Sequence, residues 1–420
     1  MLQISSLVLA GLLLQTPSLD SSNPRERLDA VEQLSIVGRT GNVPRLAEAL
    51  KKEPRSDVRA AIVAGLGRIG GQEVIPVLAQ TLDSDLDKDV RLQAIDSFQR
   101  LYIPIEEKGA LSTIFNKVKS AFAEDNRPLV HDPRAVDPAA TAALAESMQT
   151  DFVEEVRAAS ARALGSLRAQ DRVAVLVATL ESPQNRESPA VRREIAESLG
   201  FIRDPAAGPA LLRAVRDNDR RTSQNAILAI GLIGYQEGRP TLENVFQSER
   251  NTESKKRALE AIALMRDPAA KPFLESLIEH KDDGYRELAA EGLGRIGYDP
   301  KLLKARYDIE TKANVHYALA FALVAADQDQ YFNELAGGLT GRQAYQAEAY
   351  IYELGKYEGK MSEVHRYLRS TDARIRARMA RIVGDIADPS SRPLIEELTR
   401  DKDPEVASEA IMALRKLTPA

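Results

Sequence analysis

The sequence of 420 residues contains no cysteine and no tryptophan, and aromatic residues make up only 5% of it. Without cysteine the chain can form no disulfide framework, no thiolate metal site and no cysteine nucleophile. Four histidines, His131, His280, His316 and His365, are all that it has for imidazole chemistry. A basic excess is missing as well, because 57 Lys and Arg stand against 62 Asp and Glu, a net charge of −5. Nucleic-acid interfaces normally show such an excess, so we expect no nucleic-acid partner.

Sequence motifs of common catalytic sites are also missing. The chain contains no GxxxxGK[ST], HExxH or GxSxG pattern. Adjacent acidic pairs such as Glu154-Glu155 and Glu396-Glu397 are typical of solvated helix faces. We therefore predict a protein that is not an enzyme, with no catalytic residue, no metal ligand and no cofactor.

One stretch, residues 190–217, shows the pattern on which the chain is built. An apolar stripe at the spacing of one helix face runs over Val191–Ile202. Asp204-Pro205 interrupts this helix, and Pro209 begins a second apolar run. Because neither helix of such a pair can bury its stripe alone, many copies must stack on one another.

Copies of this unit recur along most of the sequence. Positions equivalent to Val191 follow one another at intervals of 29 to 35 residues, with a single interval of 66. These positions are Glu26, Val58, Val90, Val156, Val191, Thr222, Ser254, Tyr285, Val315, Gln346, Ile375 and Val406. Glycine recurs nine positions after many of them, as at Gly231 and Gly294. Glycine is unfavourable within a helix, so its recurrence indicates close approach of neighbouring helices.

The repeated "VR" pairs, "LG" pairs and D-P turns resemble the HEAT-repeat superfamily, in particular the short HEAT-like repeats of phycobilisome lyases. The resemblance implies an all-α, right-handed α-solenoid of about twelve helix pairs. It also implies that the first helices form the convex outside and the second helices line the concave inside. The second helices are expected near 43–52, 73–82, 171–181, 206–217, 238–248, 270–280, 300–308, 329–337, 360–368 and 391–400.

The pattern divides the chain into four segments. Residues 23–101 and 139–420 carry the repeats, and residues 102–138 interrupt them. In this interruption we expect a long helix over 106–123 and a proline-rich loop over 126–138, which is either functional or a tolerated insertion.

Residues 1–22 differ from everything after them. The short apolar run over 4–14 occupies the place of a secretory signal peptide and is too short to span a bilayer. We expect export to the periplasm or another extracytoplasmic space. The alternatives are an apolar helix that caps the first repeat and a cytoplasmic protein.

A basic residue follows the first position of most repeats. These basic residues are Arg27, Arg59, Arg91, Arg157, Arg192, Lys255, Arg286 and Arg376. These residues form either a basic stripe for an anionic ligand or a ladder of ion pairs with acidic residues and helix-end carbonyls. Acidic residues are plentiful, so we favour the ladder.

The resemblance includes enzymes, which require a cofactor or substrate site. Deoxyhypusine hydroxylases bind two irons through paired His-Glu motifs, whereas here Asp132, Lys281, Tyr317 and Arg366 follow the histidines. Phycobilin lyases hold a linear tetrapyrrole and direct it to a partner's cysteine, and nothing besides the repeats indicates that activity. We therefore expect a non-enzymatic, exported scaffold that binds another protein or an extended peptide and has no integral membrane span. The alternatives are a HEAT-like enzyme of the phycobilin-lyase type and a cytoplasmic regulatory scaffold.

Tyrosine is concentrated in one part of the chain. Ten of the twelve tyrosines lie within Tyr285–Tyr367. Tyr350 and Tyr357 occupy places that are apolar in other repeats, so we assign them to the core. The partner-binding site is predicted on second helices, at Tyr307, Tyr331 and Tyr367, with Arg306, Arg366 and Arg369 beside them.

Overall fold

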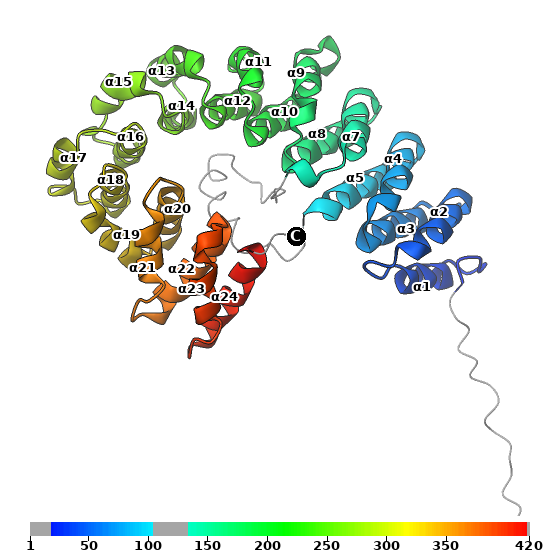
Figure 1. Cartoon of the computed structure of the whole chain (residues 1–420). Coiled ribbons are helices and arrows are strands. Elements are labelled where there is room, and N and C mark those ends of the chain that lie inside the picture. The colour runs from blue at the N-terminus through cyan, green and yellow to red at the C-terminus, as the bar shows by residue number, and fades with distance from the viewer. Residues whose placement is uncertain (1–17, 104–132, 418–420) are drawn as a thin grey trace, which may run out of the picture. The chain divides into compact units, whose positions relative to one another are not determined.

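The computed structural model describes residues 18–103 and 133–417, and throughout these ranges the chain is helical, with no strand (Figure 1). The predicted all-α solenoid of helix pairs is confirmed. The described residues form two compact units, unit 1 over 18–103 and 133–172 and unit 2 over 173–417. The segments interpreted above as a signal peptide core, over 4–14, and as a long helix, over 106–123, lie outside the described residues.

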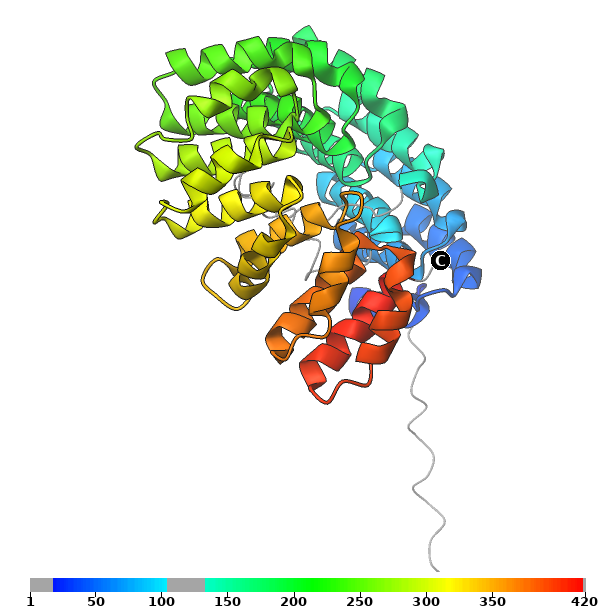
Figure 2. The ribbon, with the colours of Figure 1, turned by 60° about the vertical axis from the view of Figure 1, so that its left-hand side comes forward.

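The helices follow one another in pairs, many of them separated by a single 3-10 turn. Unit 1 contains α1 (Pro24–Leu34), α2 (Val43–Lys52), α3 (Ser56–Ile69), α4 (Ile75–Ser84), α5 (Lys88–Tyr102), α7 (Pro138–Thr150) and α8 (Glu154–Ser166). Unit 2 contains α9 (Val173–Glu181), α10 (Pro189–Ile202), α11 (Gly208–Ala214), α12 (Arg220–Ile233), α13 (Arg239–Ser248), α14 (Thr252–Leu264), α15 (Lys271–Glu275), α16 (Asp283–Arg295), α17 (Pro300–Tyr307), α18 (Ala313–Ala325), α19 (Phe332–Gly338), α20 (Ala344–Leu354), α21 (Met361–Tyr367), α22 (Ala373–Ile386), α23 (Arg392–Leu398) and α24 (Pro404–Leu417). Figure 2 shows the succession of pairs in unit 2 from a second side.

The pair formed by α10 and α11 shows how the sequence determines one unit. Val191, Leu199 and the other members of the predicted stripe are buried. Arg203 ends α10 in the left-handed conformation, with φ of 61°. The Asp204 carboxylate then accepts a hydrogen bond from the amide of Ala206 at 2.9 Å, which caps the 3-10 turn before α11. The predicted helix–turn–helix unit is therefore confirmed.

Glycines allow neighbouring first helices to touch backbone to backbone. A Cβ added at Gly231 of α12 would lie 2.5 Å from the Cα of Ala261 in α14. A Cβ at Gly294 of α16 would lie 2.6 Å from the Cα of Ala322 in α18. Real carbon–carbon contacts lie at about 3.5–4.0 Å, so only glycine fits at these positions. The predicted close approach of neighbouring helices is confirmed.

The same contacts correct the predicted inside and outside of the solenoid. In unit 2 the first helices α10, α12, α14, α16 and α18 form the inner row, and the second helices α11, α13, α15 and α17 form the outer row (Figure 1). Placing the second helices on the concave side was wrong. Helices whose backbones touch must lie on the inside of a curve, because neighbouring pairs spread apart toward its outside. The small residues of the first helices carried this information in the sequence.

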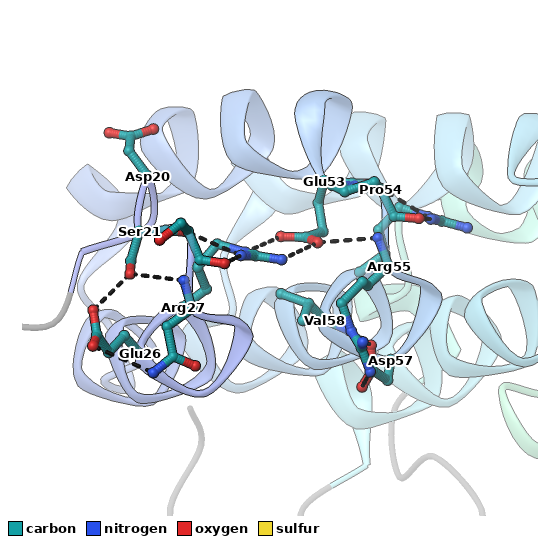
Figure 3. Close-up of polar contacts among 12 residues, drawn as sticks. Asp20, Ser21, Glu26, Arg27, Glu53, Pro54, Arg55, Asp57 and Val58 are labelled. Carbon is teal, nitrogen blue, oxygen red and sulfur yellow. Dashed lines mark hydrogen bonds and ion pairs between the residues drawn. The ribbon is translucent and has the colours of Figure 1, made fainter.

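Six of the eight basic residues predicted for the ladder form its ion pairs. Arg157 donates to the Asp151 carbonyl at 2.9 Å, the other kind of contact that was predicted, whereas Lys255 departs from the pattern and lies 5.9 Å from the centre of the Phe246 ring. Arg27 donates to both carboxylate oxygens of Glu53, at 2.7 and 2.8 Å, and to the Ser21 carbonyl at 2.9 Å (Figure 3). Glu53 in turn accepts from the backbone amide of Arg55, just before α3. Each such rung joins the linker before one first helix to the linker before the next. The equivalent pairs are Arg59–Asp85, Arg91–Asp151, Arg192–Asp217, Arg286–Glu310 and Arg376–Asp401.

Candidate functional site

Polar side chains of α20 reach past α18 and bind side chains of α16. Regular repeats contact only their neighbours, so contacts between every second repeat single out this part of unit 2. We call the side chains involved the inner cluster. It consists of Glu287, Glu291 and Arg295 on α16, Asn314 on α18, and Gln346, Tyr350 and Glu353 on α20.

The centre of the inner cluster is a buried tyrosine–carboxylate pair. The hydroxyl of Tyr350 donates to Glu291 at 2.5 Å, and both residues are buried. Gln346 donates to the same hydroxyl at 2.9 Å, and the Tyr350 ring stacks on Phe321 with centroids 4.8 Å apart. Burial and the carboxylates of Glu291 and Glu287 hold the pKa of Tyr350 well above its usual value. Tyr350 therefore stays protonated and acts as a hydrogen-bond donor.

A second carboxylate, Glu353, joins three repeats at the edge of the inner cluster. Arg295 donates to its two oxygens, each at 2.9 Å. Arg266, which follows α14, donates to Glu353 at 3.1 Å, and the Tyr357 hydroxyl donates at 3.2 Å. Burial lowers the pKa of Arg295, but the Glu353 and Glu291 carboxylates outweigh it and hold the pKa well above its usual value. Burial and Glu353 raise the pKa of Tyr357 to about 12.

The exposed side of this edge faces solvent. The side chain of Arg266 is 54% exposed and that of Glu353 is 20% exposed, whereas Arg295 behind them is 5% exposed. A guanidinium and a carboxylate thus meet at one accessible place, and Arg266 lies over the half-buried Tyr357 ring, 5.3 Å from its centre. The arrangement can bind a ligand that combines a flat apolar body, an acidic group and N–H donors.

The described residues offer no obvious place for a metal. In residues 18–103 and 133–417, no group of three or more His, Cys, Asp or Glu side chains could hold a metal ion. None of the four histidines is followed by glutamate. These side chains do not fit a pair of irons bound through His-Glu motifs.

The structure brings two of the three predicted tyrosines together. The rings of Tyr307 and Tyr331 meet edge to face with centroids 4.8 Å apart, and Tyr307 also lies 3.9 Å from the His316 ring. Tyr367 lies one repeat further along and stacks on Phe332 at 5.4 Å. All three tyrosines are half-buried. Because they belong to second helices, they lie away from the inner row, and their role in partner binding stays a prediction.

The predicted arginines are already paired. Arg306 contacts Glu310 at 3.0 Å, Arg366 contacts Glu363 at 3.6 Å, and Arg369 contacts Glu397 at 3.3 Å. The side chains of Arg366 and Arg369 remain 69% and 70% exposed, so weak surface pairs of this kind leave them accessible to a partner.

Sequence reasoning missed the inner cluster, although it assigned Tyr350 correctly to the core. Tyr357, which was assigned to the core with it, is only half-buried, because it lies at the edge of the cluster. Glu287 and Glu291 lie one helical turn apart, as do Gln346 and Tyr350. Each member of the second pair lies 59 positions after its partner in the first, which is two repeats. Polar residues that recur at the same register two repeats apart were the available signal.

None of the described helices is long and apolar enough to cross a membrane.

Comparison with known proteins places the repeats in a family. The chain matches the model of HEAT repeats over residues 14–99, 184–254, 240–324 and 363–420. It is 25% identical to a deoxyhypusine hydroxylase of Schizosaccharomyces pombe over 217 residues, which cover 50% of this chain and 65% of that protein. It is 30% identical to the bilin biosynthesis protein PecE of a Nostoc species over 101 residues, which cover 24% of this chain and 40% of that protein. The chain thus spans less than two thirds of either relative.

Among solved structures, the complex of CpcE and CpcF of phycocyanin lyase from Nostoc sp. PCC7120 is similar. The TM-score is 0.36 at 20% identity, and the alignment covers 58% of this chain and 86% of that one.

These relatives correct the functional expectation. Two curated proteins similar to this chain are named for a hydroxylase and for bilin biosynthesis, which overturns the expectation of a non-enzymatic scaffold and favours the enzyme-type alternative. Sequence reasoning considered the hydroxylase and lyase resemblances but set them aside, because the chain has no His-Glu pair and nothing besides the repeats indicated lyase activity. The matched segments cover well over half of the chain, and the resemblance stated from its repeats is confirmed: the protein belongs to the HEAT-repeat family.

Proposed function

We propose that the chain is a HEAT-type enzyme of the lyase kind, which holds a linear tetrapyrrole or a similarly flat, acidic ligand and passes it to a partner protein. The observation that carries the proposal is the edge of the inner cluster, where Arg266, Glu353 and Tyr357 meet at the solvent-facing side of a buried polar network. A structural scaffold needs no such contacts between every second repeat.

The chemistry of these side chains fits a ligand of this class. A linear tetrapyrrole has acidic side chains, pyrrole N–H groups and flat conjugated rings. Arg266 suits the acidic groups, Glu353 suits the N–H donors, and Tyr357 offers a ring face for stacking. Behind this edge, Arg295 binds both oxygens of Glu353 and so fixes the orientation of its carboxylate.

The transfer is a thiol addition, and the thiol must come from the partner because this chain has no cysteine. In such an addition a carbon–carbon double bond of the ligand gains the thiol sulfur on one carbon and the thiol proton on the other. A carboxylate at the site can carry the proton between them, and no oxidant is consumed. Glu353 lies at the solvent-facing edge of the inner cluster beside Arg266, and we assign it this role.

The lyase kind is favoured over the hydroxylase kind by the side chains themselves. The described residues and the four histidines of the sequence do not fit an iron pair held by His-Glu motifs. The proposal also requires a protein partner and a cytoplasmic location, because an exported chain would not meet an intracellular pigment.

The test is a titration of the full-length chain with biliverdin, followed by circular dichroism in the visible range. A protein-bound chromophore acquires a visible dichroic band that the free pigment lacks. We expect this band with the wild type and about tenfold weaker binding for Glu353→Gln, since a charge-assisted hydrogen bond contributes about 1.5 kcal/mol or more. Arg369→Gln, which removes an exposed arginine elsewhere in unit 2, serves as the control and should bind as the wild type does. No visible band with the wild type would contradict the proposal.

A further inference from the structure

Unit 1 exposes two large apolar side chains at equivalent places in its ladder. Leu86 follows the ladder residue Asp85 and is 91% exposed, and Phe152 follows the ladder residue Asp151 and is 80% exposed. Exposed leucine or phenylalanine at these fractions gains nothing from burial in the fold.

The fold does not require an apolar residue at this place. The residue after the ladder acid is exposed in every rung, and in the other rungs it is Pro54, Asn218, Thr311 or Lys402. Leu86 and Phe152 therefore depart from the repeat pattern, and the two departures occur in consecutive rungs of unit 1.

The two side chains border one hollow of about 240 Å³ between the ends of α4 and α7. Its lining includes Leu82, Ser147 and the buried guanidinium of Arg91, which lies 4.7 Å from the centre of the Phe152 ring. Leu86 also borders a second hollow of about 430 Å³ between α2 and α4. Leu86 is thus an exposed apolar side chain with a hollow on each side, and another chain can pack against such a surface.

The rim of the hollow between α4 and α7 is negative. Asp85 and Asp151 are neutralised by their ladder arginines, but Asp83 and Glu146 are exposed and have no ion pair within the described part of the chain. The carboxyl ends of α4 and α7, at Ser84 and Thr150, face the same rim and add the negative ends of two helix dipoles.

From these observations we infer that the Leu86–Phe152 surface, consisting of Leu86, Phe152, Asp83 and Glu146 around the hollow between α4 and α7, docks a basic amphipathic segment of a partner protein. Apolar side chains of that segment cover Leu86 and Phe152, and its Lys or Arg side chains face Asp83 and Glu146. The inference is independent of the proposed lyase function, because it concerns unit 1 and needs no pigment.

Fluorescence anisotropy tests the inference with a defined pair of probes. One is a fluorescein-labelled amphipathic helical peptide of Leu and Lys, and the other has Glu in place of every Lys. We expect the full-length chain to bind the Lys peptide more tightly. The double variant Leu86→Ser/Phe152→Ser should lose about 100-fold in affinity, because two large apolar side chains no longer become buried. Val37→Ser, which removes another exposed apolar side chain of unit 1, should leave the affinity unchanged.

Charge reversal separates docking at this surface from general attraction to an acidic protein. Asp83→Lys/Glu146→Lys should reverse the preference toward the Glu peptide, whereas the matched double variant Glu32→Lys/Glu73→Lys should not. All seven substituted positions are exposed, so melting temperatures should stay within a few degrees of the wild type. Equal affinity for both peptides, or equal losses in the target and control variants, would overturn the inference. A wild-type dimer in sedimentation that dissociates on Leu86→Ser/Phe152→Ser would place a second copy on this surface and would overturn it too.

Discussion

The backbone contact between α12 and α14 predicts that Gly231→Ala lowers the free energy of unfolding. In Gly231→Ala, the new Cβ would lie 2.5 Å from both the Cα and the carbonyl oxygen of Ala261. Carbon atoms pack at about 3.5–4.0 Å, so the two helices must separate by about 1 Å. Overpacking of a core costs about 1–3 kcal/mol, and the upper part of this range applies because backbone atoms cannot rotate away. Alanine recovers about 1 kcal/mol through its higher helix propensity. We therefore expect a net loss of about 2 kcal/mol in the free energy of unfolding.

Gly337→Ala is the matched control. Gly337 lies near the end of α19, is exposed, and a Cβ built there meets no atom within 4 Å. The same substitution should therefore stabilise the protein by about 0.5–1 kcal/mol. Urea unfolding followed by circular dichroism at 222 nm measures both changes, and amide exchange in α12 and α19 assigns them to their repeats. If Gly231→Ala were as stable as the wild type or more stable, glycine would not be needed for the close approach of α12 and α14.

Three further predictions concern the ladder, acid stability and location. Arg91→Ala should lower the free energy of unfolding by about 3–5 kcal/mol, because it leaves the buried carboxylate of Asp151 without its partner. Arg100→Ala, which removes a surface pair, should lower it by less than about 0.5 kcal/mol, and chemical unfolding measures both changes. Burial would raise the pKa of Glu310, but Arg286 and two backbone amides lower it from 4.5 to about 2. Its contribution to stability is therefore complete above pH 4.5 and is lost as the pH falls toward 2, so Glu310→Gln should flatten the loss of melting temperature over this interval. Cytoplasmic location requires that protein from the native host keeps its N-terminal residues; N-terminal sequencing that finds a start within 17–23 would show export and exclude an intracellular pigment.

The periodic part of the structure could be predicted from the sequence because each repeat contains the same apolar stripes and turn residues. The stripe over Val191–Ile202 and the Asp204-Pro205 turn predicted a helix pair, and both are present. The inside and outside of the solenoid were assigned wrongly, although glycines such as Gly231 indicated that the first helices touch one another. A small residue shows that two helices touch, and only the combination of many such contacts shows which side of the curve they occupy.

The candidate site was less predictable because it departs from the repeat. Tyr350 fills an apolar place in its own repeat, so local pattern assigned it to the core, and its hydroxyl found Glu291 two repeats away. Glu353 gains its partners in the same way, from Arg295 and from Arg266. Contacts between repeats that are two apart depend on local curvature. This curvature results from the packing of several repeats and cannot be predicted from the sequence of any single one.

Hydrogen–deuterium exchange of the full-length chain with and without biliverdin tests whether the inner cluster binds the pigment. We expect slower exchange on ligand binding in α16 and α20, over Asp283–Arg295 and Ala344–Leu354, and in the turn that contains Tyr357. Exchange in α17 and α21, which carry Tyr307 and Tyr367, in the 3-10 turn of Tyr331 before α19, and at the Leu86–Phe152 surface should not change. Protection confined to those second helices or to unit 1, with α16 and α20 unchanged, would contradict the assignment of the site to the inner cluster.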